Sequence, residues 1–155
     1  MSAEPTSIRR LAADDTAGWA AMRCALFPDE PPATLAGEIA GMLADPKQAA
    51  FVALRDGRFV GFIEAGERSV AEGAWDGPVA YIEALWVDDT ARHQGVARLL
   101  VEAVKAWAIF RGYRDLASDV QLHNTLSQTV HDRLGFTETE RLVTYLMRLD
   151  GEASG

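Results

Sequence analysis

Residues 92–97 form the stretch whose residue types and order point most directly to chemistry. They read Arg-His-Gln-Gly-Val-Ala and join a strand-like segment, residues 79–87, to a helix-like segment, residues 96–110. Backbone amides at the start of a helix have no intrahelical partner, and the helix dipole favours an anion there. Gly95 permits a positive φ or a close approach of a ligand, Ala97 is small, and Arg92 can add a charge-assisted contact. The stretch predicts a phosphate-binding turn, although many α/β proteins carry such turns without a ligand.

Several other chemistries have no support in the sequence. No Gly-Lys-Ser/Thr follows the turn, and two glycines of the dinucleotide fingerprint are missing. His93 and His123 lack metal-ligand spacing, so no metal is expected. No Ser–His or Cys–His arrangement suggests an acyl-enzyme. Cys24 is the only cysteine, so an intrachain disulfide is impossible and a packing role is favoured.

Two carboxylates stand at positions where they could meet a cation. Glu83 lies in the middle of a strand-like segment, where burial is costly without a partner, although an edge or an exposed sheet face explains it as well. Asp119 ends the predicted strand at residues 115–119, where a turn-forming aspartate is the alternative. The chain has 15 Lys and Arg against 23 Asp and Glu, a net charge of −8. This charge disfavours nucleic acid as a partner and is compatible with a cationic substrate, although solubility alone accounts for it.

The elements that must position these residues follow an alternating order. A length of 155 residues suggests one domain, and we assign it to residues 1–150 with a flexible tail at 151–155. Hydrophobic periodicity, caps and turn residues predict the elements. In order, they are a strand at 7–11, helices at 15–26 and 33–43, strands at 50–55, 58–65 and 79–87, a helix at 96–110, a strand at 115–119, a helix at 125–134, and one or two closing strands within 137–149. This order indicates a mixed α/β sheet with helices on its faces.

The turn and its context resemble a known family. Arg92-x-x-Gly95-x-Ala97 after a strand resembles the Q/R-x-x-G-x-G/A acetyl-CoA signature of the GNAT superfamily of N-acetyltransferases, and the order of elements is similar over nearly the whole chain. Residues 117–119 and 124–141 look like the aminoglycoside 6′-N-acetyltransferases, as do residues 7–10, Trp19, Arg23 and residues 26–28. The resemblance implies the GNAT fold, with a mixed, mostly antiparallel central sheet and helices on both faces.

The resemblance also implies how acetyl-CoA would bind. The pyrophosphate would lie on Gln94, Gly95, Val96, Ala97 and Arg98, mainly on their backbone amides, with Arg92 beside it. The backbone of Leu85, Trp86 and Val87 would pair with the pantetheine arm like an added strand. An amide near Leu85 would polarise the thioester carbonyl. Asn124 would bond the cofactor arm, or cap its helix, or do both.

For the second substrate, the resemblance implies a polycationic amine such as an aminoglycoside. Glu83 and Asp119 would bind the cation and help to deprotonate the attacking amine. Glu140 would line the same site, or belong to a solvated edge. Phe27 would stack on sugar rings, or plug the end of its helix. The loop after residue 67 lacks the aromatic residue that the family often carries there, which puts substrate preference in doubt.

The remaining roles concern the leaving thiolate and the setting of the enzyme. His131 or Tyr145 would donate the proton, since a tyrosine with a pKa of about 10 stays protonated at neutral pH and a histidine near 6.5 is partly protonated. The alternatives are a GNAT enzyme for another amine, such as a polyamine or a peptide N-terminus, and a non-catalytic module that binds acyl-CoA. The resemblance suggests a homodimer. No signal peptide or membrane span is expected, so we place the protein in the cytoplasm.

Overall fold

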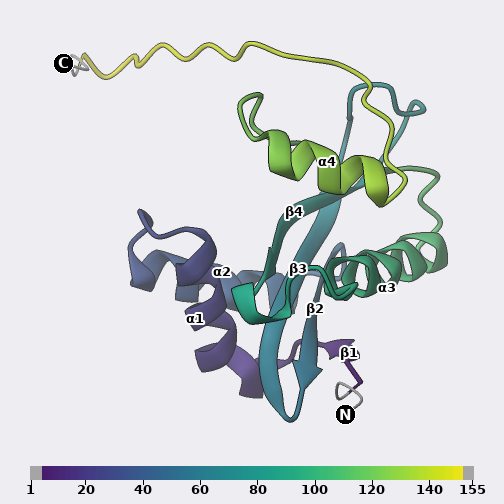
Figure 1. Cartoon of the computed structure of the whole chain (residues 1–155). Coiled ribbons are helices and arrows are strands. Elements are labelled where there is room, and N and C mark those ends of the chain that lie inside the picture. Colours follow the sequence, from purple (N-terminus) through teal and green to yellow (C-terminus); the bar gives the residue numbers. More distant parts are fainter. Residues whose placement is uncertain (1–4, 152–155) are drawn as a thin grey trace.

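A five-stranded sheet forms the centre of the computed structural model, which describes residues 5–151 (Figure 1). Its strands lie side by side in chain order: β1 (Ser7–Arg10), β2 (Gln48–Arg55), β3 (Arg58–Arg68), β4 (Val79–Val87) and β5 (Leu116–Ala117). Neighbours from β1 to β4 are antiparallel, and β5 runs parallel to β4. Asp56 and Gly57, with φ of 54° and 70°, form the predicted hairpin turn between β2 and β3.

Helices cover both faces of this sheet, as predicted. They are α1 (Thr16–Leu26), α2 (Pro32–Ala44), α3 (Val96–Phe110) and α4 (Thr125–Arg133), with short 3-10 turns η1 (Ala13–Asp15) and η2 (Asp89–Ala91). On one face, α3 buries Val96, Leu100, Val104 and Trp107, a helical spacing, against the sheet. On the other face, α1 and α2 bury Trp19, Met22 and Ile39. None of the helices in residues 5–151 has the length and apolar character that a membrane span requires.

The prediction of closing strands within residues 137–149 was wrong. The chain has no regular secondary structure there, and Leu142, Leu146 and Leu149 are exposed. Figure 1 shows the segment leaving the body of the molecule after α4. Alternating apolar residues indicate a preference for extended backbone, but a strand also needs a neighbour to bond. Among residues 5–151, no strand pairs with this segment. Of the predicted tail, only Gly151 lies within the described residues.

The strand predicted at 115–119 is also shorter, and its end opens the sheet. Pairing of β4 with β5 stops at Tyr81 opposite Ala117. From residue 82 to 87, that edge of β4 therefore has no strand partner in the described chain. On its other edge, Ala84 pairs with Glu64 and Ile82 with Ala65, so Glu83 is an extra, unpaired residue. Such a bulge changes the direction of the strand and re-aims its side chains, here at the point where the sheet opens.

Candidate active site

The predicted phosphate turn has the geometry of an anion site. Gly95 caps α3 with φ of 80° and ψ of 9°, a left-handed conformation that side chains rarely adopt. The first bond of the helix runs from the Leu99 amide to the Gly95 carbonyl at 3.1 Å, so the amides of Val96, Ala97 and Arg98 have no intrahelical acceptor. A Cβ placed on Gly95 would meet nothing within 4 Å, so the space in front of the turn is open. The residues present fit a diphosphate bound by backbone amides.

Three exposed side chains of the turn are bonded to neighbouring elements. The bonds join Arg92 to the carbonyl of Val87 at 3.2 Å, Arg98 to the carbonyl of Arg133 at 2.7 Å, and Gln94 to the guanidinium of Arg55. Arg92 also pairs with Asp89 at 3.0 Å. These contacts hold the turn against β4, α4 and the β2–β3 hairpin. The backbone amides that would face a ligand have no such bond, and the exposed guanidiniums of Arg92 and Arg98 keep further N–H donors beside them.

The open edge of β4 lies at residues 82–87, just before this turn in the chain. Leu85 and Val87 pack towards α3, and Trp86 packs on the opposite face, where its ring centroid lies 6.4 Å from that of Phe62. Their side chains serve the core, while their backbone lines the gap between β4 and the chain beyond β5. Asn124 is the N-cap residue of α4. Its Oδ1 accepts a bond from the Ser127 amide at 3.0 Å, which confirms the helix-cap alternative.

The two predicted substrate carboxylates belong to one cluster of charged and aromatic side chains. Arg68, the last residue of β3, donates Nε to Oε1 of Glu83 at 2.8 Å and Nη2 to Oε2 at 2.7 Å. Its guanidinium lies 3.5 Å from the ring centroid of Tyr81, and the Tyr81 hydroxyl donates to Oδ2 of Asp119 at 2.5 Å. Burial and the bond to Asp119 raise the pKa of Tyr81 to about 12, so this hydroxyl stays a donor.

Sequence reasoning did not find Arg68 and Tyr81. Arg68 looked like part of a polar loop, and Tyr81 like a core residue of its strand. The only signal was alternation: Tyr81 and Glu83 are two residues apart, so they share one face of β4.

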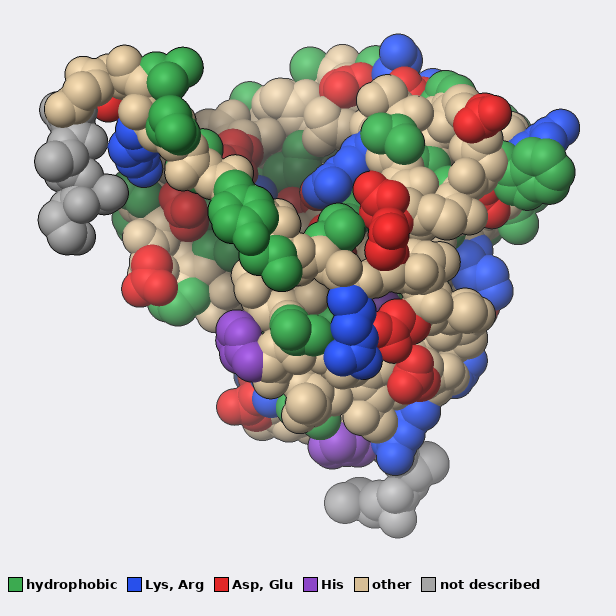
Figure 2. All heavy atoms as spheres, turned by 90° about the horizontal axis from the view of Figure 1, so that it is seen from above, with side chains coloured by type: hydrophobic (Ala, Val, Ile, Leu, Met, Phe, Trp, Pro, Cys, Tyr) green, Lys and Arg blue, Asp and Glu red, His purple; other side chains and the backbone are tan. Residues whose placement is uncertain are grey.

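The view from above shows a hollow beside the C-terminal segment, with acidic and basic side chains in and around it (Figure 2).

His131, one of two candidate proton donors, is held by bonds to both ring nitrogens. Its Nδ1 lies 2.8 Å from the carbonyl oxygen of Ser127, and its Nε2 lies 2.8 Å from Oγ of Ser118. Because a carbonyl only accepts, Nδ1 carries a proton and Nε2 faces the Ser118 hydroxyl. The structure thus contains a Ser–His contact that the sequence did not lead us to expect. Tyr145, the other candidate, is 91% exposed in the projecting segment, so one chain does not bring it to Glu83.

Phe27 and Glu140 lie in other contacts. Phe27 follows the last residue of α1, is half-buried in the cluster beneath α1 and α2, and lies 5.8 Å below the guanidinium of Arg23. This is the position expected of a plug at the end of the helix. Glu140 lies on the C-terminal segment facing Glu72, and that carboxyl raises the pKa of Glu140. Within residues 5–151, no hydrogen bond or ring contact joins either residue to the carboxylate cluster.

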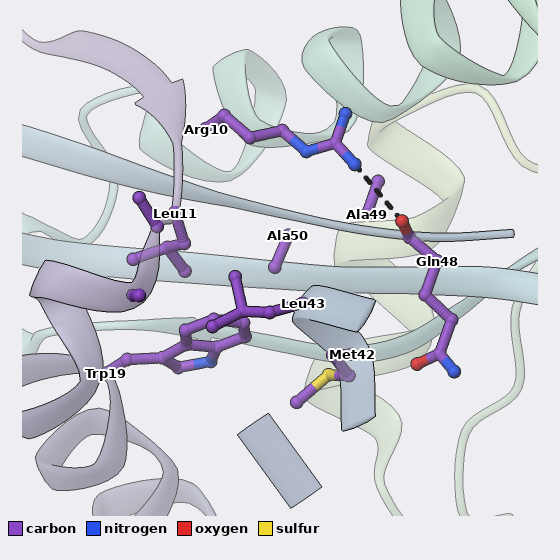
Figure 3. A pocket seen from close by; sticks show the side chains of 10 residues that line it. Arg10, Leu11, Trp19, Met42, Leu43, Gln48, Ala49 and Ala50 are labelled. Carbon is purple, nitrogen blue, oxygen red and sulfur yellow. Dashed lines mark hydrogen bonds between the residues drawn. The ribbon is translucent and has the colours of Figure 1, made fainter. Parts of the chain in front are cut away.

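A separate pocket of about 410 Å³ lies at the edge formed by β1, α1, α2 and β2 (Figure 3). Its walls include Leu11, Trp19, Met42 and Leu43, and Arg10 closes one side by donating to the carbonyl of Gln48 at 3.1 Å. It holds none of the predicted site residues. In the described part of the chain, no group of three or more His, Cys, Asp or Glu side chains is placed to hold a metal ion.

Comparison with known proteins places this geometry in context. The model of the acetyltransferase (GNAT) family matches residues 11–136. An aminoglycoside N(6′)-acetyltransferase type 1 of Serratia marcescens is 40% identical over 134 residues, covering 85% of this chain and 92% of that protein. One from Stenotrophomonas maltophilia is 36% identical and covers 99% and 100%. A solved structure of AAC(6′)-Iy in complex with a bisubstrate analogue, CoA-S-monomethyl-acetylneamine, superposes with a TM-score of 0.89 at 34% identity, covering 94% and 99%.

Proposed function

We propose that this chain, which belongs to the acetyltransferase (GNAT) family, transfers the acetyl group of acetyl-CoA to the 6′-amino group of aminoglycosides. The observation that carries the proposal is one arrangement of elements. The carboxylates of Glu83 and Asp119 share a cluster at the start of the open edge of β4, and that strand leads into the Gly95 turn. An acyl donor held at the turn and along this edge would reach a cationic acceptor held by the carboxylates.

The cofactor would be held mainly by backbone groups. The amides of residues 94–98 would bind the pyrophosphate, and the backbone of the segment Leu85, Trp86 and Val87 would pair with the pantetheine arm. Asn124 would bond the arm through the side-chain amide group left free by its cap. Backbone N–H donors that the strand already holds in place need no reorganisation during the reaction. The same edge of β4 is therefore suited to stabilise the oxyanion. A similar protein, AAC(6′)-Iy, has been solved in complex with a CoA-based bisubstrate analogue, which supports a CoA-type cosubstrate.

The reaction we propose is direct attack within a ternary complex. An ammonium of the substrate gives a proton to Asp119 or Glu83, directly or through water, and its free nitrogen attacks the thioester carbon. The new N–C bond forms and the C–S bond breaks. The nitrogen then gives up its extra proton to the other carboxylate or to water as the amide forms, and the thiolate takes up a proton. His131, in its doubly protonated form, is the favoured donor because the Ser118 and Ser127 bonds hold its ring next to β5, whereas Tyr145 projects from the body of the chain. Glu140 and Phe27 remain proposed contacts to the antibiotic.

We further propose a homodimer completed by residues 137–149. This segment exposes six large apolar side chains, Leu142, Val143, Tyr145, Leu146, Met147 and Leu149, each at least 61% exposed. An exposed apolar segment of this kind is costly in water and marks an interaction site. Pairing with the sheet edge of a second copy would supply its missing strand partner and bring Tyr145 and Glu140 to that copy.

The proposed unit is one domain, residues 1–150. We place it in the reducing cytoplasm, which a single unpaired Cys24 fits.

An assay of the purified full-length chain with acetyl-CoA and an amine panel tests the function. The panel contains kanamycin and tobramycin, a 4,5-linked aminoglycoside, a polyamine and a peptide with a free N-terminus. With kanamycin, we expect thiol release and a product that carries one additional acetyl group on its 6′ nitrogen. Turnover of only the polyamine or peptide would redirect the assignment to another amine. Binding of acetyl-CoA without any turnover would make the chain a non-catalytic acyl-CoA module.

A further inference from the structure

Arg68 occupies a position with unusual electrostatic character. Its planar guanidinium has one face 3.5 Å from the centroid of the Tyr81 ring and one edge bonded to both oxygens of Glu83. The negative face of an aromatic ring and a carboxylate are the two surroundings that proteins use most to bind organic cations. The hydroxyl of the same ring is bonded to Asp119, so a cation here also lies near a second carboxylate.

While it persists, the pair weakens the attraction of Glu83 for any other cation. Both of its oxygens are taken by Arg68, and the charges of the two side chains cancel. Arg68 also covers the ring of Tyr81, which is only 8% exposed. Tyr81 is the aromatic ring that contacts both Arg68, through its face, and Asp119, through its hydroxyl. A substrate cation would find its carboxylate and its ring already occupied.

We infer that the Arg68 guanidinium occupies the position of a substrate ammonium group, between Glu83 and the face of Tyr81, and that substrate binds by displacing it. The inference rests on the proposed function and names the site of one ammonium. Arg68 is then a resident counter-ion: it balances Glu83 in the free enzyme and competes with substrate for it. It sets affinity without touching the reacting atoms.

The exposure of the pair makes displacement feasible. The side chains of Arg68 and Glu83 are 44% and 41% exposed, so water can solvate Arg68 once it swings out from the end of β3. Exposed ion pairs contribute little net stability. The buried pair of Arg23 and Glu64, at 7% and 4%, contrasts with it, since separating those charges would leave both without solvent. Of the two Arg–carboxylate pairs, only the one at the proposed site can open for a ligand.

The test compares Arg68→Met with Arg9→Met in the full-length chain. Arg9, 47% exposed, forms a similar two-bond pair on β1, far along the sheet, with the less exposed Asp15 (10%) at 2.8 and 2.9 Å. Both variants therefore lose one charge and one such pair. Arg68→Met should lower KM for kanamycin about fivefold, the effect of removing a modest competing pair. The KM for acetyl-CoA and kcat should stay within about twofold. Arg9→Met should change none of these constants.

A double-mutant cycle with Glu83→Gln decides whether the competition is for Glu83. Alone, Glu83→Gln should raise KM for kanamycin, and Arg68→Met added to it should give no further change. A rise in KM with Arg68→Met, a loss of kcat, or an undiminished effect in the Glu83→Gln background would overturn the inference. Kanamycin affinity measured by calorimetry without acetyl-CoA should follow the same pattern. If the wild-type chain turns over no aminoglycoside, the proposed function fails; if it does and Arg68→Met leaves KM unchanged, only this inference fails.

Discussion

At the scale of single residues, the site depends on which groups keep their protons. Tyr81, with a pKa raised to about 12 by burial and by Asp119, acts as a fixed donor across the working range of pH and cannot serve as a base. Its bond orients one oxygen of Asp119 and leaves the other free. Asp119 is therefore the carboxylate that stands ready in the free enzyme, while Glu83 becomes available once Arg68 leaves.

Asp119→Asn tests this division of roles. The amide can still accept the Tyr81 bond, so the fold should be kept, but it cannot take a proton from the amine. We expect kcat with kanamycin to fall by about 100-fold or more, as for loss of a general base, with acetyl-CoA affinity unchanged within about twofold. Asp56→Asn is the control, since asparagine tolerates the hairpin position with its φ of 54°. Loss of acetyl-CoA binding in Asp119→Asn would instead assign this residue a structural role.

The site residues that the sequence predicted and those that it did not differ in what determines their contacts. Glu83, Asp119 and the Gly95 turn could be named because a family pattern and local rules fix them. Arg68, Tyr81 and Ser118 could not, because their contacts depend on strand register and on the bulge at Glu83. A shift of one residue in that register would send Tyr81 and Glu83 to the other face of the sheet. No local pattern in the sequence specifies that register.

At the scale of elements, a buried polar network ties the two N-terminal helices to the sheet. Glu64 of β3 accepts bonds from Trp19 Nε1 and Arg23 Nε, both at 2.8 Å, and Arg23 also donates to the carbonyl of Leu35 on α2. Burial raises the pKa of Glu64, and its carboxyl helps to raise that of Arg23. Arg68 is the last residue of β3, so this network also holds in place the strand that carries Arg68.

Arg23→Met should therefore destabilise the chain strongly. It leaves Glu64 buried without its cation, and breaking such a pair costs about 3–5 kcal/mol. A urea titration monitored by circular dichroism should show a large fall in the midpoint. The double variant Arg23→Met with Glu64→Leu should recover part of that loss, since it removes the unpaired charge as well. A single variant as stable as the wild type would show that water reaches this network.

The junction of β1 with η1 gives the chain a measurable response to acid. The Arg9 guanidinium and the Ala12 amide lower the pKa of Asp15 from 3.8 to about 2. A lowered carboxyl pKa stabilises the fold above pH 4, and that contribution is lost as pH falls from about 4 to about 2. Asp15→Asn should remove on the order of 1 kcal/mol at pH 7. The gap between its melting temperature and that of the wild type should close over the same window; a gap that persists at pH 2 would contradict this origin.

At the scale of the whole molecule, the C-terminal segment is the part that a single chain does not explain. The sequence indicated that this segment prefers extended backbone. It did not indicate which strand the segment would pair with, because pairing depends on the neighbours of the segment and not on its own residues. The sheet, in contrast, was predicted nearly element for element, since local patterns and short connections determine it.

Leu146→Glu tests whether this segment joins two copies. Leu146 is 85% exposed, and a charge there would oppose burial against a partner. Sedimentation of the wild type should give twice the chain mass of 16.8 kDa, and the variant should sediment as a single chain. Ile109→Glu is the matched control, because Ile109 is 72% exposed on α3 and should leave the mass unchanged. A wild-type chain that sediments alone at high concentration would exclude the dimer.

Calorimetric titration of coenzyme A into the folded full-length chain is the most direct test of the central claim, that the start of α3 grips a diphosphate. We expect one molecule bound per chain and an affinity reduced at least about tenfold in Gly95→Val, whose side chain would strain a φ of 80° and fill the space before the free amides. A folded wild-type chain that binds neither coenzyme A nor its acetyl ester would contradict the account.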